Sequence, residues 1–134
     1  MKMPLSLAMF SVLSIGGIAH ASPARDLTEA IARTHDDGIR VAYHAAETII
    51  AERDLATAQL EMKTTRDRWD AAVRADHPDE AAKWAEAHMH AQDAAKAAYN
   101  RAVAERAERD LARADFRRDA EEAMRAKRAS KNRG

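Results

Sequence analysis

The stretch VRADHPDEAAKW, residues 73–84, decides the fold, because it contains the only proline of residues 24–134. Proline is accommodated at the first position of a helix, and it disfavours the α conformation for the residue before it. His77 is therefore predicted to lie outside a helix, between one helix that ends near Ala75 or Asp76 and another that begins at Pro78. A stop followed directly by a start is typical of a short turn between two antiparallel helices.

Strong helix formers dominate the sequence on both sides of this turn, and charged residues make up 33% of the chain. Asp26 and Glu29 have the spacing of a capping box, so a helix can start at Leu27. The prediction is an all-α fold: an elongated antiparallel two-helix hairpin, coiled-coil-like, with arms of about 27–75 and 78–127 and the turn at 76–77. Two alternatives stay open at Gly38, which either lies within a continuous first helix or interrupts it, since a mid-helix glycine costs only about 1 kcal/mol.

A hairpin requires apolar residues of the two arms to face each other, and the positions of facing residues then have a nearly constant sum. The large side chains can be matched in this way as Trp69 with Trp84, Met62 with Ala91, Leu55 with Tyr99, Ile50 with Val103, Tyr43 with Leu111 and Ile39 with Phe116. Leu55, Met62 and Trp69 share one heptad phase, whereas Tyr43 and Ile50 lie on another, which predicts a phase slip at 52–54.

A lone hairpin gives each helix only one neighbour, so Val41, Ile49 and Leu60 are expected to be partly exposed. Dimerisation into a four-helix bundle would cover them, which predicts a homodimer. If Pro78 only kinked one long helix, the alternative would be an extended dimeric coiled coil.

Residues 1–21 have the features of a cleavable signal peptide. Lys2 is followed by an apolar run of about fifteen residues, shorter than the roughly twenty needed to span a bilayer, and Ala19-His20-Ala21 suits signal peptidase. We therefore expect cleavage between Ala21 and Ser22, a periplasmic or secreted bacterial protein and no stable membrane span after cleavage. Retention of the segment as a signal anchor is the alternative.

The composition excludes several classes of protein. The sequence has no cysteine, so no disulfide can compensate for a thin core. Its formal net charge is zero, which does not favour nucleic-acid binding. Residues 128–134 are basic and lack large apolar side chains, and we expect them to form a disordered tail.

Catalytic motifs are also missing from the sequence. There is no cysteine nucleophile, glycine-rich phosphate loop, GxSxG elbow or HExxH pair. Carboxylates are abundant, but a catalytic carboxylate needs a pocket to shift its pKa, and a narrow hairpin offers none. The sequence therefore predicts a non-enzymatic protein without a cofactor.

Metal binding is the main alternative function. Residues 87–93, AHMHAQD, contain His88 and His90, and an envelope protein could use such residues for zinc or copper. Residues two apart on a helix point in different directions, whereas His90 shares a face with Glu86 and Asp93. The candidate ligands are thus His88, His90, Glu86 and Asp93, with His77 as a possible addition. The simpler interpretation is that these histidines are surface or loop residues.

The most economical prediction of function is an exported structural or protein-interaction protein of the bacterial envelope, acting as a homodimer or on a protein partner. Trp69 and Trp84 either stack on each other and clamp the turn or form an exposed knob that docks a partner. Alternatives are a periplasmic metal-binding or metal-sensing protein and a small envelope-stress chaperone.

Overall fold

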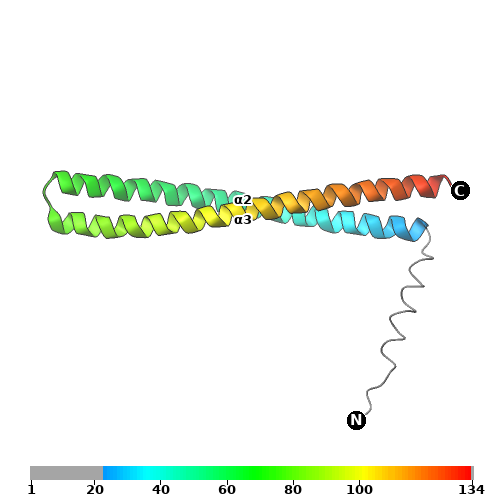
Figure 1. Cartoon of the computed structure of the whole chain (residues 1–134), viewed down its shortest axis with the longest axis horizontal. Coiled ribbons are helices and arrows are strands. Elements are labelled where there is room, and N and C mark those ends of the chain that lie inside the picture. The colour runs from blue at the N-terminus through cyan, green and yellow to red at the C-terminus, as the bar shows by residue number, and fades with distance from the viewer. Residues whose placement is uncertain (1–22, 134) are drawn as a thin grey trace, which may run out of the picture. The chain divides into compact units, whose positions relative to one another are not determined.

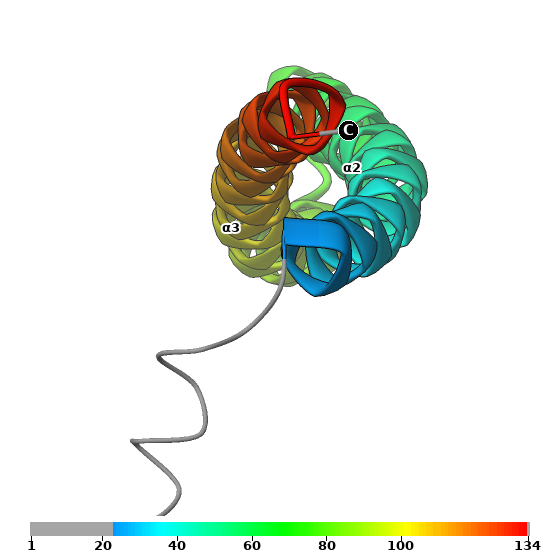
Figure 2. The ribbon, with the colours of Figure 1, turned by 90° about the vertical axis from the view of Figure 1, so that its right-hand side faces the viewer.

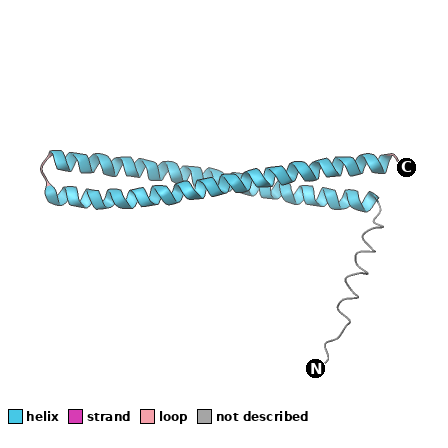
Figure 3. Cartoon of the chain, in the orientation of Figure 1, coloured by secondary structure: helices cyan, strands magenta, loops and turns pink. Residues whose placement is uncertain are grey.

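The computed structural model describes residues 23–133, and this part of the chain is helical except for short turns (Figure 3). Helix α2 spans Pro23–Arg74 and helix α3 spans Pro78–Lys131, with no strand among the described residues. The two helices pack against each other as an α-helical hairpin, as predicted. The described residues divide into two compact units, one formed by residues 23–37 together with 115–133, and the other by residues 38–114.

The turn between the helices is built by four backbone hydrogen bonds, one of them from the Ala75 amide to the Ala71 carbonyl, and by one left-handed residue. The amide of His77 donates to the carbonyl of Ala72 at 3.0 Å, and the amide of Asp76 donates to that of Val73 at 3.1 Å. This pair of bonds defines a Schellman motif, in which the residue after the helix is left-handed; here it is Asp76, with a φ of 54°. The carbonyl of His77 accepts the Ala81 amide at 2.8 Å, so α3 begins as soon as α2 has been capped.

The helix ends differ modestly from those predicted. Helix α2 begins at Pro23 and runs without a break through Gly38, so the helix is continuous at this glycine. Helix α3 continues to Lys131, so the prediction of a disordered tail from residue 128 was wrong for its first four residues. Alanine, arginine and lysine in this segment are strong helix formers, and basic residues in a last turn favour the negative end of the helix dipole.

Within the unit of residues 38–114, the two helices lie side by side in both views (Figures 1 and 2). The residues that face the other helix recur every three or four positions, which is the heptad spacing of a coiled coil. We call these positions the seam. On α2 they are Val41, His44, Thr48, Ala51, Leu55, Ala58, Met62, Thr65, Trp69 and Ala72, and on α3 they are Ala81, Trp84, His88, Ala91, Ala95, Ala98, Ala102, Glu105, Arg109 and Ala112, all buried or half-buried.

The phase slip predicted at 52–54 was wrong, because the seam on α2 keeps one heptad phase from Val41 to Ala72. Between residues 44 and 51, the seam positions of α2 are occupied by His44, Thr48 and Ala51 rather than by the larger apolar residues that were matched from the sequence. Those matched residues are exposed instead: Ile39, Tyr43, Ile50, Tyr99, Val103, Leu111 and Phe116. Small seam residues allow a close approach of the helices, so alanine and threonine can occupy a position where bulk was expected.

Threonine is compatible with the seam because its hydroxyl finds a backbone partner on its own helix. Thr48 is only 1% exposed, and its hydroxyl donates to the His44 carbonyl at 2.7 Å. Ion pairs join the helices along the edges of the seam: Arg101 contacts Asp54 at 3.0 Å and Glu47 at 3.5 Å, and Arg106 contacts Glu52 at 2.9 Å. These exposed pairs fix register more than they stabilise, since such pairs contribute only about 0–1 kcal/mol.

The other unit also pairs a segment of α2 with a segment of α3. Ala30 is buried, and Thr34 donates its hydroxyl to the Ala30 carbonyl at 2.8 Å. Arg33 joins the two segments through an ion pair with Glu122 at 3.1 Å. Asp37 and Asp119 are both buried, so this part of the seam is polar.

The predicted signal peptide, residues 1–21, lies outside the described residues. Within residues 23–133, neither helix contains a stretch that is long and apolar enough to cross a membrane.

Candidate functional site

His88, one of the four candidate metal ligands, lies in the seam and is 6% exposed. Its Nδ1 lies 3.1 Å from the Met62 carbonyl and 3.1 Å from the Thr65 hydroxyl. A carbonyl can only accept, so we assign the ring proton to Nδ1, which leaves Nε2 as the nitrogen with a lone pair. The imidazole also packs on the indole of Trp69, with 5.9 Å between the ring centroids. His88 therefore links the two helices.

The other candidate ligands lie on the solvent-facing side of α3. His90 Nε2 is 3.8 Å from a carboxylate oxygen of Glu86, and both side chains are 72% exposed. Asp93 is exposed as well. The structure thus brings Glu86 and His90 together and places His88 apart from them. Among residues 23–133, no group of three or more histidine, cysteine, aspartate or glutamate side chains is arranged to hold a metal ion. Zinc or copper binding stays a prediction.

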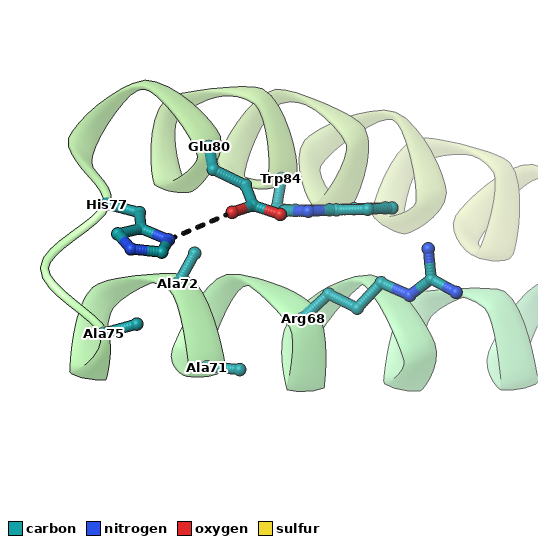
Figure 4. A pocket seen from close by; sticks show the side chains of 7 residues that line it. All are labelled: Arg68, Ala71, Ala72, Ala75, His77, Glu80 and Trp84. Carbon is teal, nitrogen blue, oxygen red and sulfur yellow. Dashed lines mark hydrogen bonds and ion pairs between the residues drawn. The ribbon is translucent and has the colours of Figure 1, made fainter.

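The hairpin tip contains an open hollow of about 390 Å³, shown in Figure 4. On one side, His77 Nδ1 lies 3.3 Å from a carboxylate oxygen of Glu80. On the other side, the guanidinium of Arg68 from α2 lies 4.7 Å from the ring centroid of Trp84 on α3, a cation–π contact. The two tryptophans therefore have different partners, Arg68 and Lys83 for Trp84 and Arg66 and His88 for Trp69, in place of the predicted mutual stack.

A buried carboxyl pair lies in the other unit. The side chain of Asp37 hydrogen-bonds to Asp119, and this bond is the main reason why the pKa of Asp119 is lowered. Burial opposes the lowering, and Arg118, whose Nε lies 3.3 Å from Asp119, adds to it. The surroundings of Asp119 therefore favour its ionised form.

A continuous apolar face of the unit of residues 38–114 lies on the side of α2 that points away from the seam. We call it the outer face of α2. It comprises Ile39, Ala42, Tyr43, Ala46, Ile49, Ile50, Arg53, Ala56, Thr57 and Leu60, and every one of them is exposed. Leu60 is 65% and Tyr43 is 59% exposed. Across about six turns, Arg53 is the single charged residue of this face, and Thr57 adds one hydroxyl.

The apolar character ends toward the tip, where Lys63, Asp67 and Arg74 take the equivalent positions on α2. The outward positions of α3 between 97 and 114 are also mostly apolar, including Val103 and Leu111. Sequence reasoning anticipated the exposure of Ile49 and Leu60 but missed the continuous face. Extending the phase of Leu55, Met62 and Trp69 back to Thr48 and Val41 would have found it.

No protein-family model matches this chain, and neither does any curated protein or any solved structure with which it was compared.

Proposed function

We propose that the chain is an exported, non-enzymatic interaction protein of the bacterial cell envelope that binds a protein partner through the outer face of α2. The observation that carries this proposal is the inverted distribution of side chains. Alanine, threonine and histidine fill much of the seam, while isoleucine, leucine and tyrosine are directed to solvent. Apolar patches of this extent mark binding surfaces in soluble proteins.

The position of the apolar residues supports a surface for a helix rather than for a small molecule. Ile39, Tyr43, Ile50 and Leu60 recur at helical spacing along one line, which is the arrangement that a second helix can pack against. Replacing them with polar residues would leave the seam untouched, so the fold of the hairpin does not account for their presence.

The envelope location is proposed from the N-terminal sequence. Lys2, the apolar run and Ala19-His20-Ala21 form the three parts of a cleavable export signal. Mass spectrometry of the chain recovered from an exporting bacterium is expected to show Ser22 as its first residue. A mass that includes residues 1–21 would show that the segment is retained and would favour an anchored protein.

Site-specific photo-crosslinking in cells tests the binding surface. A photo-reactive residue is placed at Tyr43 or at Leu60, with Asp67 as the matched control, since Asp67 is exposed on the same helix beyond the outer face. Adducts of defined mass from Tyr43 and Leu60, with none from Asp67, are expected. Equal labelling from all three positions, or none from any, would count against the proposed surface.

A further inference from the structure

The outer face of α2 is complementary in size to a second copy of itself. When two such faces are laid antiparallel about a two-fold axis between Ile49 and Ile50, Tyr43 lies opposite the partner's Ala56, so a large residue meets a small one. At each end, Ile39 lies opposite the partner's Leu60, and this apolar contact closes the face. An isologous interface requires this kind of self-complementarity, because each contact occurs twice.

The charges around the face fit the same arrangement. Arg53, the single charge within the face, lies opposite the partner's Ala46 and therefore beside the partner's Glu47. At the edge, Arg40 lies near the partner's Glu61. Opposite charges thus meet across the axis at four places, since each pair occurs twice. Glu47 also lies near the partner's Asp54, and Arg101 of its own chain pairs with both of these carboxylates in each copy. Complementary charges of this kind fix the register and orientation of an interface.

The surrounding charges disfavour a lipid surface as the occupant. Arg40 and Arg53, with Arg101 and Arg106 of α3, match the four carboxylates that border the outer face, those of Glu47, Glu52, Asp54 and Glu61, so this face carries no excess of positive charge. Helices that bind anionic membranes carry lysine and arginine along the apolar face instead.

We propose that two copies of this chain pair antiparallel through their α2 outer faces, with Ile49 and Ile50 at the two-fold axis. This inference rests on the proposed function and names the partner of the same surface. The hairpins then contribute four helices to one assembly, with the two copies of α2 in contact at its centre.

Single cysteines test the register, because the natural chain has none. With a short bis-maleimide, Ile50→Cys is expected to crosslink to its own copy, whereas Ile39→Cys and Leu60→Cys alone are not. Equivalent ends of an antiparallel pair are about 30 Å apart at 1.5 Å rise per residue. An equimolar mixture of the Ile39→Cys and Leu60→Cys chains is expected to crosslink. Self-linking of Ile39→Cys would indicate parallel pairing and overturn the proposed arrangement.

Analytical ultracentrifugation of the chain recovered from an exporting bacterium tests the pairing itself. The wild type is expected to sediment as a dimer. Ile50→Glu places two carboxylates at the axis and is expected to weaken dimerisation about a hundredfold, since juxtaposed like charges cost several kcal/mol. Met89→Glu is the matched control, because Met89 is similarly exposed but lies on α3 outside the face. Circular dichroism confirms that both variants keep their helices.

The outcomes separate this inference from the proposed function. A monomeric wild type that still gives adducts with a different protein at Tyr43 would overturn self-pairing and keep the interaction surface. A wild-type dimer that Ile50→Glu and Met89→Glu leave equally intact would place the dimer interface elsewhere. A monomer without any adduct would overturn both.

Discussion

Asp76 is the residue on which the reversal of the chain depends most directly. Its φ of 54° lies in the left-handed region, which L-residues other than glycine, asparagine and aspartate rarely enter. Asp76→Gly is expected to stabilise the chain by about 0.5–1 kcal/mol, because glycine adopts this φ without steric cost. Asp76→Val is expected to destabilise it by about 1–2 kcal/mol. Urea unfolding followed by circular dichroism measures both, and equal stability of the two variants would contradict this account of the turn.

His88 and His90 are only two positions apart, and the structure gives them different energetic roles. His88→Ala removes a buried ring and its cross-helix hydrogen bonds, so a loss of about 2–3 kcal/mol in the free energy of unfolding is expected. His90→Ala changes an exposed side chain and is expected to stay within about 0.5 kcal/mol of the wild type. Similar losses for both variants would show that His88 does not link the helices as described.

The carboxyl pair of Asp37 and Asp119 predicts a dependence of stability on pH. The lowered pKa of Asp119 means that its ionised form is favoured in the fold. Its contribution is therefore present above the ordinary aspartate pKa and is lost when the pH falls through the lowered value.

Asp119→Asn tests this dependence, because an asparagine amide does not titrate. The melting temperature of the wild type is expected to fall as the pH is lowered through and below the ordinary aspartate range, whereas that of Asp119→Asn is expected to change less over the same range. Glu29→Gln is the control, since Glu29 is an exposed carboxylate in the same unit. Parallel pH profiles for all three chains would show that ionised Asp119 does not contribute to the stability of the fold.

At the scale of the elements, the seam depends on small side chains. Ala102 is completely buried between the helices, so Ala102→Leu is expected to push them apart and to cost about 1–3 kcal/mol or more. Ala104→Leu is the matched control on the same helix; Ala104 is exposed on the outward side, and its replacement is expected to be nearly neutral. A thermal melt compares the two variants. Equal melting temperatures would mean that the seam has room for larger residues.

The helices and their turn could be predicted from the sequence because local signals determine them. Pro78 placed the start of α3, and alanine-rich composition predicted the rest of both helices. The side chains within the seam could not be predicted in the same way. Matching by size alone predicted that Tyr43 and Ile50 face the other helix. In the structure, Thr48 and Ala51 are the residues buried against it. Two helices that approach closely favour small residues between them. No local sequence pattern distinguishes such a helix pair from one that is packed by large side chains.

The candidate site could be predicted only in part for the same reason. Helical spacing correctly paired Glu86 with His90 and separated His88 from them. The cross-helix neighbours of His88, Thr65 and Met62, depend on the register of the hairpin. Register is a property of the packed helices, so these contacts emerged only from the structure.

For the whole molecule, the proposed pairing makes stability depend on protein concentration. Binding of a second copy to the folded chain alone stabilises it by mass action, so the melting temperature is expected to rise with concentration. The melting temperature of the Ile50→Glu chain is expected to stay constant over the same range of protein concentration. A wild-type melting temperature that is independent of concentration would contradict a reversible dimer that dissociates on unfolding.

The two tryptophans are confined to the tip, each about two helical turns from the reversal at Asp76 and His77. Trp69 packs against His88, and Trp84 lies beside Arg68, so their ultraviolet emission is sensitive to the opening of this end. Far-ultraviolet circular dichroism, by contrast, sums over both helices. The native sequence thus carries its own local fluorophores, and a difference between the two signals during denaturation would reveal whether the tip separates before the remaining turns melt.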